Sequence, residues 1–312
     1  MIGSVLRVRK SVPLKLAADF MTVTRPRKFI PFLLVFLNAQ LLSTGQVNWP
    51  NSFCASIFIL ASCSFGMRLN AWTDRELDQS TKPELYRNLA QSFRLHVFGM
   101  ALESAISFAF LVFLMRGQGS SGAIWLLLFG SLFSLYSFNY FVPRRGKEYR
   151  LKIYWWGNLL SAGGGYFALW MAGLSASPGS LNFKACLFLA FICASFEYVV
   201  FLGECAADAE QEKMANLQTL PAILGRLGVV FLAWISCLLL AISWFGFGRA
   251  WIGGLFGDWY AISSLAICSG FLYFARMPNP PTPWDKFADL SFWIIRLAAL
   301  AILLFVQGAR NV

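Results

Sequence analysis

Long apolar runs alternate with short polar segments along most of the chain. Each run is close to the ~20 residues that a helix needs to cross the hydrocarbon layer, and none alternates with a period of two. Continuous runs of this kind predict transmembrane helices and not a membrane β-barrel. The nine predicted spans are residues 29–47, 52–72, 95–115, 122–142, 153–174, 183–203, 228–247, 251–275 and 288–308.

The composition indicates an integral membrane protein. Hydrophobic residues make up 58% of the 312 residues, the mean hydropathy is +0.60, and charged residues make up only 13%. Soluble proteins carry about 25% charged residues, so most of this surface is not adapted to water. Because no soluble-looking block interrupts the apolar runs, we predict a single all-α transmembrane domain over residues 1–312. The seven cysteines lack CxxC spacing, and packing is their expected role.

The distribution of basic residues predicts the orientation in the membrane. With nine spans, 21 of the 26 Lys and Arg residues fall on the side of the N-terminus, four on the opposite side, and Arg296 inside the last span. By the positive-inside rule, the N-terminus is cytoplasmic and the C-terminus lies on the other side. Residues 1–28 are basic and amphipathic, which predicts an interfacial segment and not a cleaved signal. Membrane topology accounts for the net charge of +11, and we expect no nucleic-acid partner.

Two polar segments each place three oxygen-bearing side chains four residues apart. Positions i, i+4 and i+8 line one face of a helix, so each set is predicted to form a ladder. Each ladder lies at the end of a predicted span, on the cytoplasmic side. The first ladder is Asn70, Asp74 and Asp78, and the second is Glu204, Asp208 and Glu212.

The ladders suggest a site for a metal ion and a diphosphate. Carboxylates that converge in a mostly apolar protein repel one another unless cations join them, and such oxygen ligands suit Mg²⁺. Nearby basic side chains would bind the phosphate oxygens. A diphosphate beside a membrane-buried cavity indicates an isoprenoid diphosphate with its tail in the bundle. The basic run 142–152 could equally serve only to set the topology. The basic candidates are Lys82, Arg87, Arg145, Lys147 and Lys213.

Three ionisable side chains lie deep within predicted spans. Glu103 and Glu197 are expected to face the bundle, because a carboxylate facing lipid at mid-helix costs about 2.5–3.5 kcal/mol. Glu197 precedes Glu204 by seven residues on the same helix face. It either looks along the cavity toward a second substrate or makes an interhelical hydrogen bond. Arg296 is expected to snorkel or to pair with an acid.

Four segments occur in a recognisable order: "TRPRKF" (24–29), "NAWTDRELD" (70–78), "YFVPRRGK" (140–147) and "DAEQEKMANLQTLPAILG" (208–225). This series resembles the motifs of the UbiA superfamily of intramembrane prenyltransferases. Those motifs are an Arg-Pro start of the first helix, NDxxDxxxD, a tyrosine–proline–lysine loop, and DxxxD followed by Thr-Leu-Pro. The resemblance implies nine transmembrane helices around a central cavity, with the acidic motifs in cytoplasmic loops after the second and sixth helices.

The chain departs from the family pattern at a few positions. Ala71 stands where the family usually has Asp, and Glu212 replaces the last Asp of the second motif. The Arg-Pro-x-x-x-Gly ending of the first motif is missing after Asp78. Glutamate still offers carboxylate oxygens, so metal binding is expected to survive these changes. We interpret the chain as a divergent member, from specialised metabolism.

The resemblance implies a Mg²⁺-dependent enzyme that ionises a prenyl diphosphate and transfers the prenyl group to an acceptor, which is aromatic or another small lipophilic molecule. Its catalytic residues would be Asp74, Asp78, Asp208 and Glu212, which hold Mg²⁺ with Asn70 and Glu204 as further ligands. Aromatic side chains would shield the allylic cation from water and stabilise it through cation–π contacts. The candidates near the cation or the acceptor are Trp72, Tyr136, Tyr140, Tyr166 and Glu197.

Three alternatives remain open at this stage. A terpene cyclase of the same superfamily would form product from prenyl diphosphate alone. Transfer of a phosphosugar to a polyprenyl phosphate would leave prenyl diphosphates untouched. A transporter would place ionisable groups near the bilayer midplane, whereas here the acids gather mostly at one face.

Overall fold

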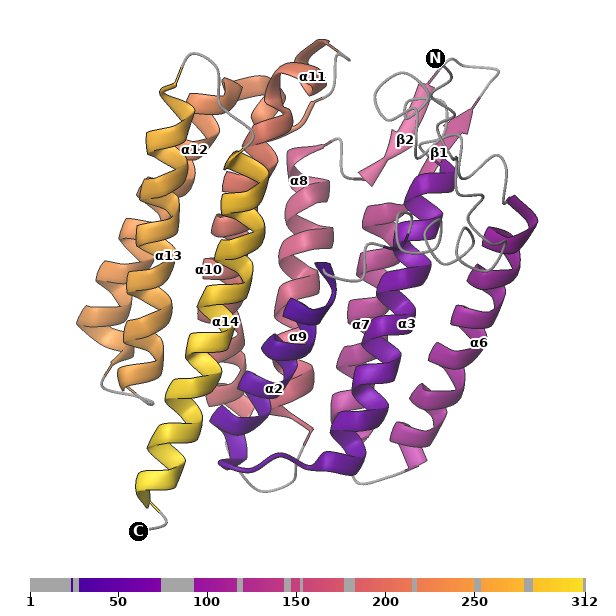
Figure 1. Ribbon diagram of the computed structural model, residues 1–312, viewed down its shortest axis with the longest axis vertical. Coiled ribbons are helices and arrows are strands. Elements are labelled where there is room, and N and C mark those ends of the chain that lie inside the picture. Colours follow the sequence, from indigo (N-terminus) through magenta and orange to yellow (C-terminus); the bar gives the residue numbers. More distant parts are fainter. Residues whose placement is uncertain are drawn as a thin grey trace, which may run out of the picture.

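The structure is a computed structural model, and it is a bundle of long helices (Figure 1). It describes residues 24, 28–73, 93–116, 120–142, 147–151, 154–176, 183–214, 218–249, 254–277 and 283–310. The α-helices are α2 (Ile30–Thr44), α3 (Trp49–Thr73), α6 (Phe93–Arg116), α7 (Ser120–Ser137), α8 (Trp155–Asn158), α9 (Gly164–Leu174), α10 (Phe183–Cys205), α11 (Ala209–Met214), α12 (Leu220–Ser243), α13 (Gly254–Ala275) and α14 (Pro283–Arg310). Shorter turns are the π-helices η4 (Leu159–Gly163) and η6 (Trp244–Gly248) and the 3₁₀-helix η5 (Ala206–Asp208).

Every predicted span overlaps a helix, and the helical fold class is confirmed. Within the described ranges, six helices are long and apolar enough to cross a membrane. They are Trp49–Thr73, Phe93–Arg116, Phe183–Asp208, Leu220–Gly248, Gly254–Ala275 and Lys286–Phe305. Helix α2 and residues Ser121–Ser137 are shorter apolar helices, and η4 interrupts the helical segment between α8 and α9. Nine membrane crossings therefore remain a prediction.

One feature of the fold was not predicted, a short β-hairpin. Strands β1 (Asn139–Val142) and β2 (Lys147–Arg150) pair antiparallel, with Asn139 opposite Arg150 and Val142 opposite Lys147. The predicted span 122–142 was therefore wrong at its end, because the helix stops at Ser137. A short apolar run such as "NYFV" has no periodicity that separates a strand from a helix. The hairpin lies at the same end of the bundle as α11 (Figure 1).

Local sequence signals explain where two of the helices begin or end. Helix α2 stops at Gly45, which adopts φ 73° and donates its N–H to Leu41 O, a left-handed cap that glycine adopts without steric cost. Helix α12 starts after Thr219, whose Oγ1 accepts a hydrogen bond from Ala222 N at 3.2 Å. Gly225, with φ 71° and ψ 167°, breaks the helical path after its first turn. The main part of α12 therefore begins close to the predicted start of its span.

Helix α9 lies at the centre of the packing and contacts α2, α7 and α10. Its Trp170 is completely buried. Gly173 allows α2 to come close, since a Cβ there would lie 2.5 Å from Phe36 O. By contrast, large apolar side chains such as Phe108, Phe247 and Phe305 are 69–79% exposed, as expected for residues that face lipid.

Candidate functional site

A cavity of about 310 Å³ lies between α2, α3, α7, α9, α10 and α14. Its lining combines a charged opening with aromatic sides, and one buried arginine contributes to its inner part. The lining residues are Lys28, Phe29, Pro31, Phe32, Met67, Asn70, Phe133, Tyr136, Ser137, Tyr166, Phe201, Glu204, Cys205, Asp208, Asp289, Phe292, Trp293 and Arg296. Segments far apart in the sequence thus share one chamber.

We call the five polar residues Lys28, Asn70, Glu204, Asp208 and Asp289 the mouth of the cavity. Lys28 Nζ donates to Glu204 Oε1 at 3.1 Å and lies 3.8 Å from Asp289 Oδ1. The side chains of Lys28 and Asp289 are 44% and 57% exposed, so the mouth is accessible from outside. Oxygen donors and one ammonium group converge there.

The segment of the second predicted ladder is not one continuous α-helix. Helix α10 ends at Cys205, and η5 and α11 follow as separate turns. Glu204 and Asp208 still both line the cavity. Glu212, on α11, accepts a hydrogen bond from Thr219 Oγ1 at 2.5 Å. Because Thr219 also caps α12, this threonine ties the end of the ladder to the start of the next long helix.

Aromatic rings form the sides of the cavity, which we call its wall. Phe201 packs edge-on against Tyr136 and Tyr166, with ring centroids 6.1 and 6.3 Å away. Phe32 lies 5.9 Å from Tyr166 and 6.0 Å from Phe133. The faces of such rings attract a cation and exclude water. Two predicted candidates, Tyr136 and Tyr166, are thereby placed together.

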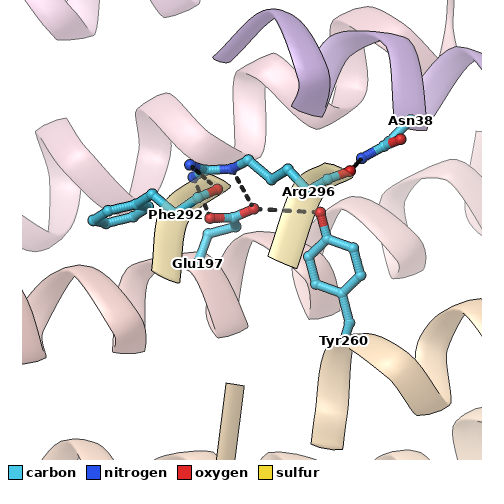
Figure 2. A network of polar contacts seen from close by, with 5 residues as sticks. All are labelled: Asn38, Glu197, Tyr260, Phe292 and Arg296. Carbon is cyan, nitrogen blue, oxygen red and sulfur yellow. Dashed lines mark hydrogen bonds and ion pairs between the residues drawn. The ribbon is translucent and has the colours of Figure 1, made fainter. Parts of the chain in front are cut away.

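The inner end of the cavity contains a buried ion pair between α10 and α14 (Figure 2). Arg296 Nη2 pairs with Glu197 Oε2, and Arg296 Nε donates to Glu197 Oε1 at 3.2 Å. Tyr260 donates its hydroxyl to the same carboxylate at 3.4 Å. Of the two expectations for Arg296, pairing with an acid is confirmed. Glu197 makes the interhelical contact and is not among the cavity-lining residues.

Several predicted residues lie outside the described ranges: Asp74, Asp78, Lys82, Arg87 and Arg145. The interfacial segment 1–28 lies outside them except for Thr24 and Lys28. The structure describes only the backbone of Tyr140, in β1, and of Lys147, in β2. Trp72 is 38% exposed on α3, Lys213 is exposed on α11, and neither lines the cavity.

Sequence reasoning missed two residues of the mouth, Lys28 and Asp289. Lys28 immediately precedes the first span, and basic residues there are usually attributed to topology. Asp289 stands at the start of the last span, four residues after Asp285, and this i, i+4 spacing of two acids was one usable signal. Its spacing of seven residues from Arg296 was a second usable signal, because residues seven apart share one helix face.

A second buried charge cluster joins α3 to α6, away from the cavity lining. Arg68 Nε donates to Glu103 Oε1 at 2.9 Å, and Ser64 Oγ donates to the same oxygen at 2.5 Å. Arg68 Nη1 and His96 Nδ1 are 2.6 Å apart. The expectation that Glu103 faces the bundle is confirmed, since its side chain is 11% exposed.

Known structures share this architecture. The UbiA homologue of Archaeoglobus fulgidus bound to GPP and Mg²⁺ is similar with a TM-score of 0.64 and 15% identity, over 91% of this chain and 99% of that one. A digeranylgeranylglyceryl phosphate synthase is similar with a TM-score of 0.61 and 18% identity, over 93% and 99%. The apo UbiA homologue of Aeropyrum pernix K1 is similar with a TM-score of 0.57 and 15% identity, over 93% and 98%.

At these identities the structural matches show the shared fold. No curated protein matches the sequence significantly. The sequence model of the UbiA prenyltransferase family, however, matches residues 29–304, which is most of the chain. The predicted membership of this family is thereby confirmed. The chain is an integral membrane protein that belongs to the UbiA prenyltransferase family.

Proposed function

We propose that this enzyme ionises an isoprenoid diphosphate in a Mg²⁺-dependent step and transfers the prenyl group to a small lipophilic acceptor, for which an aromatic compound is the best candidate. The observation that carries the proposal is a single cavity with oxygen donors and Lys28 at its mouth and aromatic rings along its wall. The polar end suits a diphosphate, and the apolar part suits a prenyl chain. The A. fulgidus homologue bound to GPP and Mg²⁺ has the same fold.

The donor set at the mouth fits a hard divalent cation. Asn70, Glu204 and Asp208 offer amide and carboxylate oxygens, the ligands that Mg²⁺ prefers. Within the described part of the chain, no group of three or more His, Cys, Asp or Glu side chains is close enough to hold a metal ion. We therefore assign the remaining ligands to Asp74 and Asp78, with Glu212 oriented by Thr219. When bound, Mg²⁺ supplies charge that stabilises a diphosphate leaving group.

Basic residues of the chain neutralise the leaving group in this proposal. Lys28 already bridges two carboxylates at the mouth, so its ammonium lies where phosphate oxygens would bind. Donors aimed at developing negative charge lower the barrier because they need no reorganisation during the reaction. Further donors are assigned from the sequence: Lys82, Arg87, Arg145, Lys147 and Lys213.

The aromatic wall protects the allylic cation that remains after the carbon–oxygen bond breaks. Tyr136 and Tyr166 line the same cavity as the mouth residues, and Phe201 packs edge-on against both, with ring centroids 6.1 and 6.3 Å away. Their ring faces stabilise positive charge, and their bulk keeps water from capturing it. Trp72 and Tyr140 remain weaker candidates for this role. Capture by an acceptor then completes the transfer.

We further propose nine membrane crossings, a cytoplasmic N-terminus, a C-terminus on the opposite side, and a mouth that opens to the cytoplasm. The excess of Lys and Arg on one side supports this orientation. The deep acids argue against a transporter, because Glu103 and Glu197 are each held by a buried arginine. Transport would require such groups to bind a cargo.

The test measures binding and turnover of geranyl and farnesyl diphosphates by the purified protein in lipid. Binding that requires Mg²⁺ and is lost in Asp208→Ala is expected. Glu210→Ala is the matched control, since Glu210 is an exposed acid on α11 that does not line the cavity. Product formed without an acceptor would instead indicate a terpene cyclase. Full binding in excess chelator, or no binding at all, would contradict the proposal and leave phosphosugar transfer or transport to be tested.

A further inference from the structure

Two polar layers connect α10 to α14. In the outer layer, Lys28 lies between Glu204 and Asp289, and in the inner layer Arg296 pairs with Glu197. The two acids of α10 are seven residues apart, and so are the two charged residues of α14. Seven residues of α-helix advance about 10 Å. The two layers are therefore about 10 Å apart along the helices.

The inner layer is held by contacts from four helices (Figure 2). Besides the bonds to Glu197, Arg296 Nη1 donates to Phe292 O at 3.2 Å. Asn38 Nδ2, on α2, donates to Arg296 O at 3.0 Å. Tyr260 reaches the carboxylate from α13. An apolar side chain at this place could rotate aside, whereas moving either partner of the ion pair leaves a buried charge unpaired.

Beyond the inner layer the bundle is filled. Trp170 and Tyr260 are 0% and 1% exposed, with ring centroids 5.6 Å apart. Phe256 is buried against both, at 6.1 and 5.0 Å. These three rings continue the packing from the ion pair toward the opposite end of the bundle. A chain that enters from the mouth meets Arg296 first and then this aromatic packing.

We propose that the Glu197–Arg296 pair closes the inner end of the cavity and limits the substrate to a prenyl chain of about two isoprene units. The inference rests on the proposed function, with the diphosphate at the mouth. An extended chain advances about 3.3–3.6 Å for every three bonds, so about 10 Å corresponds to eight or nine bonds. That is the length of a geranyl main chain with its carbon–oxygen bond. A farnesyl chain would have to displace the ion pair.

The experiment measures Mg²⁺-dependent binding of dimethylallyl, geranyl and farnesyl diphosphates to the purified protein, with Asp208→Ala subtracted as nonspecific partition into lipid. We expect affinity to rise from dimethylallyl to geranyl and to fall at least tenfold at farnesyl. If farnesyl diphosphate bound as tightly as geranyl diphosphate, or more tightly, this inference would be overturned and the proposed function would stand. If none of the three binds, the proposed function fails, and this inference with it.

Opening the inner end tests the role of the pair directly. In Glu197→Ala/Arg296→Ala the two charges and most of the side-chain volume are removed together, and farnesyl is expected to bind as tightly as geranyl. The matched control is Arg68→Ala/Glu103→Ala, which removes a buried pair that does not line the cavity. It should keep the geranyl preference. A folded Glu197→Ala/Arg296→Ala protein that keeps the wild-type preference would contradict the proposal. If this variant does not fold, the wild-type binding series decides.

Discussion

Among the residues that the structure describes, two arginine–glutamate pairs lie inside the bundle, and their surroundings differ. Glu197 and Arg296 are each 1% exposed and receive further contacts from Tyr260 and Asn38. Arg68 and Glu103 are 3% and 11% exposed, and they join α3 to α6. Only 22% of the most apolar stretch of α6 is buried inside the bundle. Arg296 of the first pair lines the cavity, whereas the second pair fastens a helix at the edge of the bundle. The same two residue types are thus proposed to limit the substrate chain in one place, and they attach a helix in the other.

The largest expected effect is the loss of Arg296. Arg296→Ala leaves the carboxylate of Glu197 buried and unpaired, which typically destabilises a protein by about 3–5 kcal/mol. Thermal unfolding in a fixed detergent, followed by tryptophan fluorescence, measures the change. Glu197→Leu/Arg296→Met is the control, because it removes both charges and should recover most of the loss. A single variant as stable as the wild type would show that the pair is not essential to packing.

A smaller loss is expected from Arg68→Ala, about 1–3 kcal/mol. The side chain of Glu103 is 11% exposed, against 1% for Glu197, and it keeps the hydrogen bond from Ser64, so its charge is less isolated than that of Glu197. The same unfolding assay applies. If Arg68→Ala destabilised the protein more than Arg296→Ala, the comparison between the two pairs would be reversed.

Removing the hydroxyl group that donates to each carboxylate should have the opposite order of effects on stability, with the larger loss at Glu103. Ser64 donates to Glu103 at 2.5 Å, whereas Tyr260 donates to Glu197 at 3.4 Å, near the limit of a hydrogen bond. We expect Ser64→Ala to destabilise by about 1 kcal/mol and Tyr260→Phe by about half of that, in line with polar side-chain contacts within membranes. Both substitutions conserve shape reasonably well. Equal losses would mean that distance does not control the strength of these bonds.

The smallest effect on stability is expected at the mouth, from Lys28→Ala. Its ion pairs with Glu204 and Asp289 are solvent-accessible, and such pairs contribute about 0–1 kcal/mol. Binding should respond more strongly, because Lys28 is proposed to contact the diphosphate. The readout is the affinity for prenyl diphosphate in the presence of Mg²⁺, and Lys184→Ala, an exposed lysine on α10 that does not line the cavity, is the control. Unchanged affinity together with lower stability would assign Lys28 a purely structural role.

Much of the molecule was predictable because the sequence features that specify it, apolar runs, regular spacings and short motifs, are local or periodic. Apolar runs located the helices, since each must hide its backbone polar groups from lipid on its own. Glu204 and Asp208 were predicted to act together, and both line the cavity. The four motifs identified the family. The roles of Asp74, Asp78, Lys82, Arg87 and Arg145 remain predictions, as these residues lie outside the described ranges.

Only the tertiary structure decided which distant residues meet. The sequence indicated that Glu197 and Arg296 were too costly to face lipid, but it offered two possibilities for each, and their 99-residue separation hid the contact. Lys28 and Asp289 likewise became part of the mouth only through the packing of α14 against α2 and α10. Helix periodicity determines which face a side chain occupies, whereas the neighbour of that face depends on how all the helices pack. The sequence alone therefore determined a membrane bundle with an acidic opening, and packing decided how that opening is lined and how deep the cavity runs.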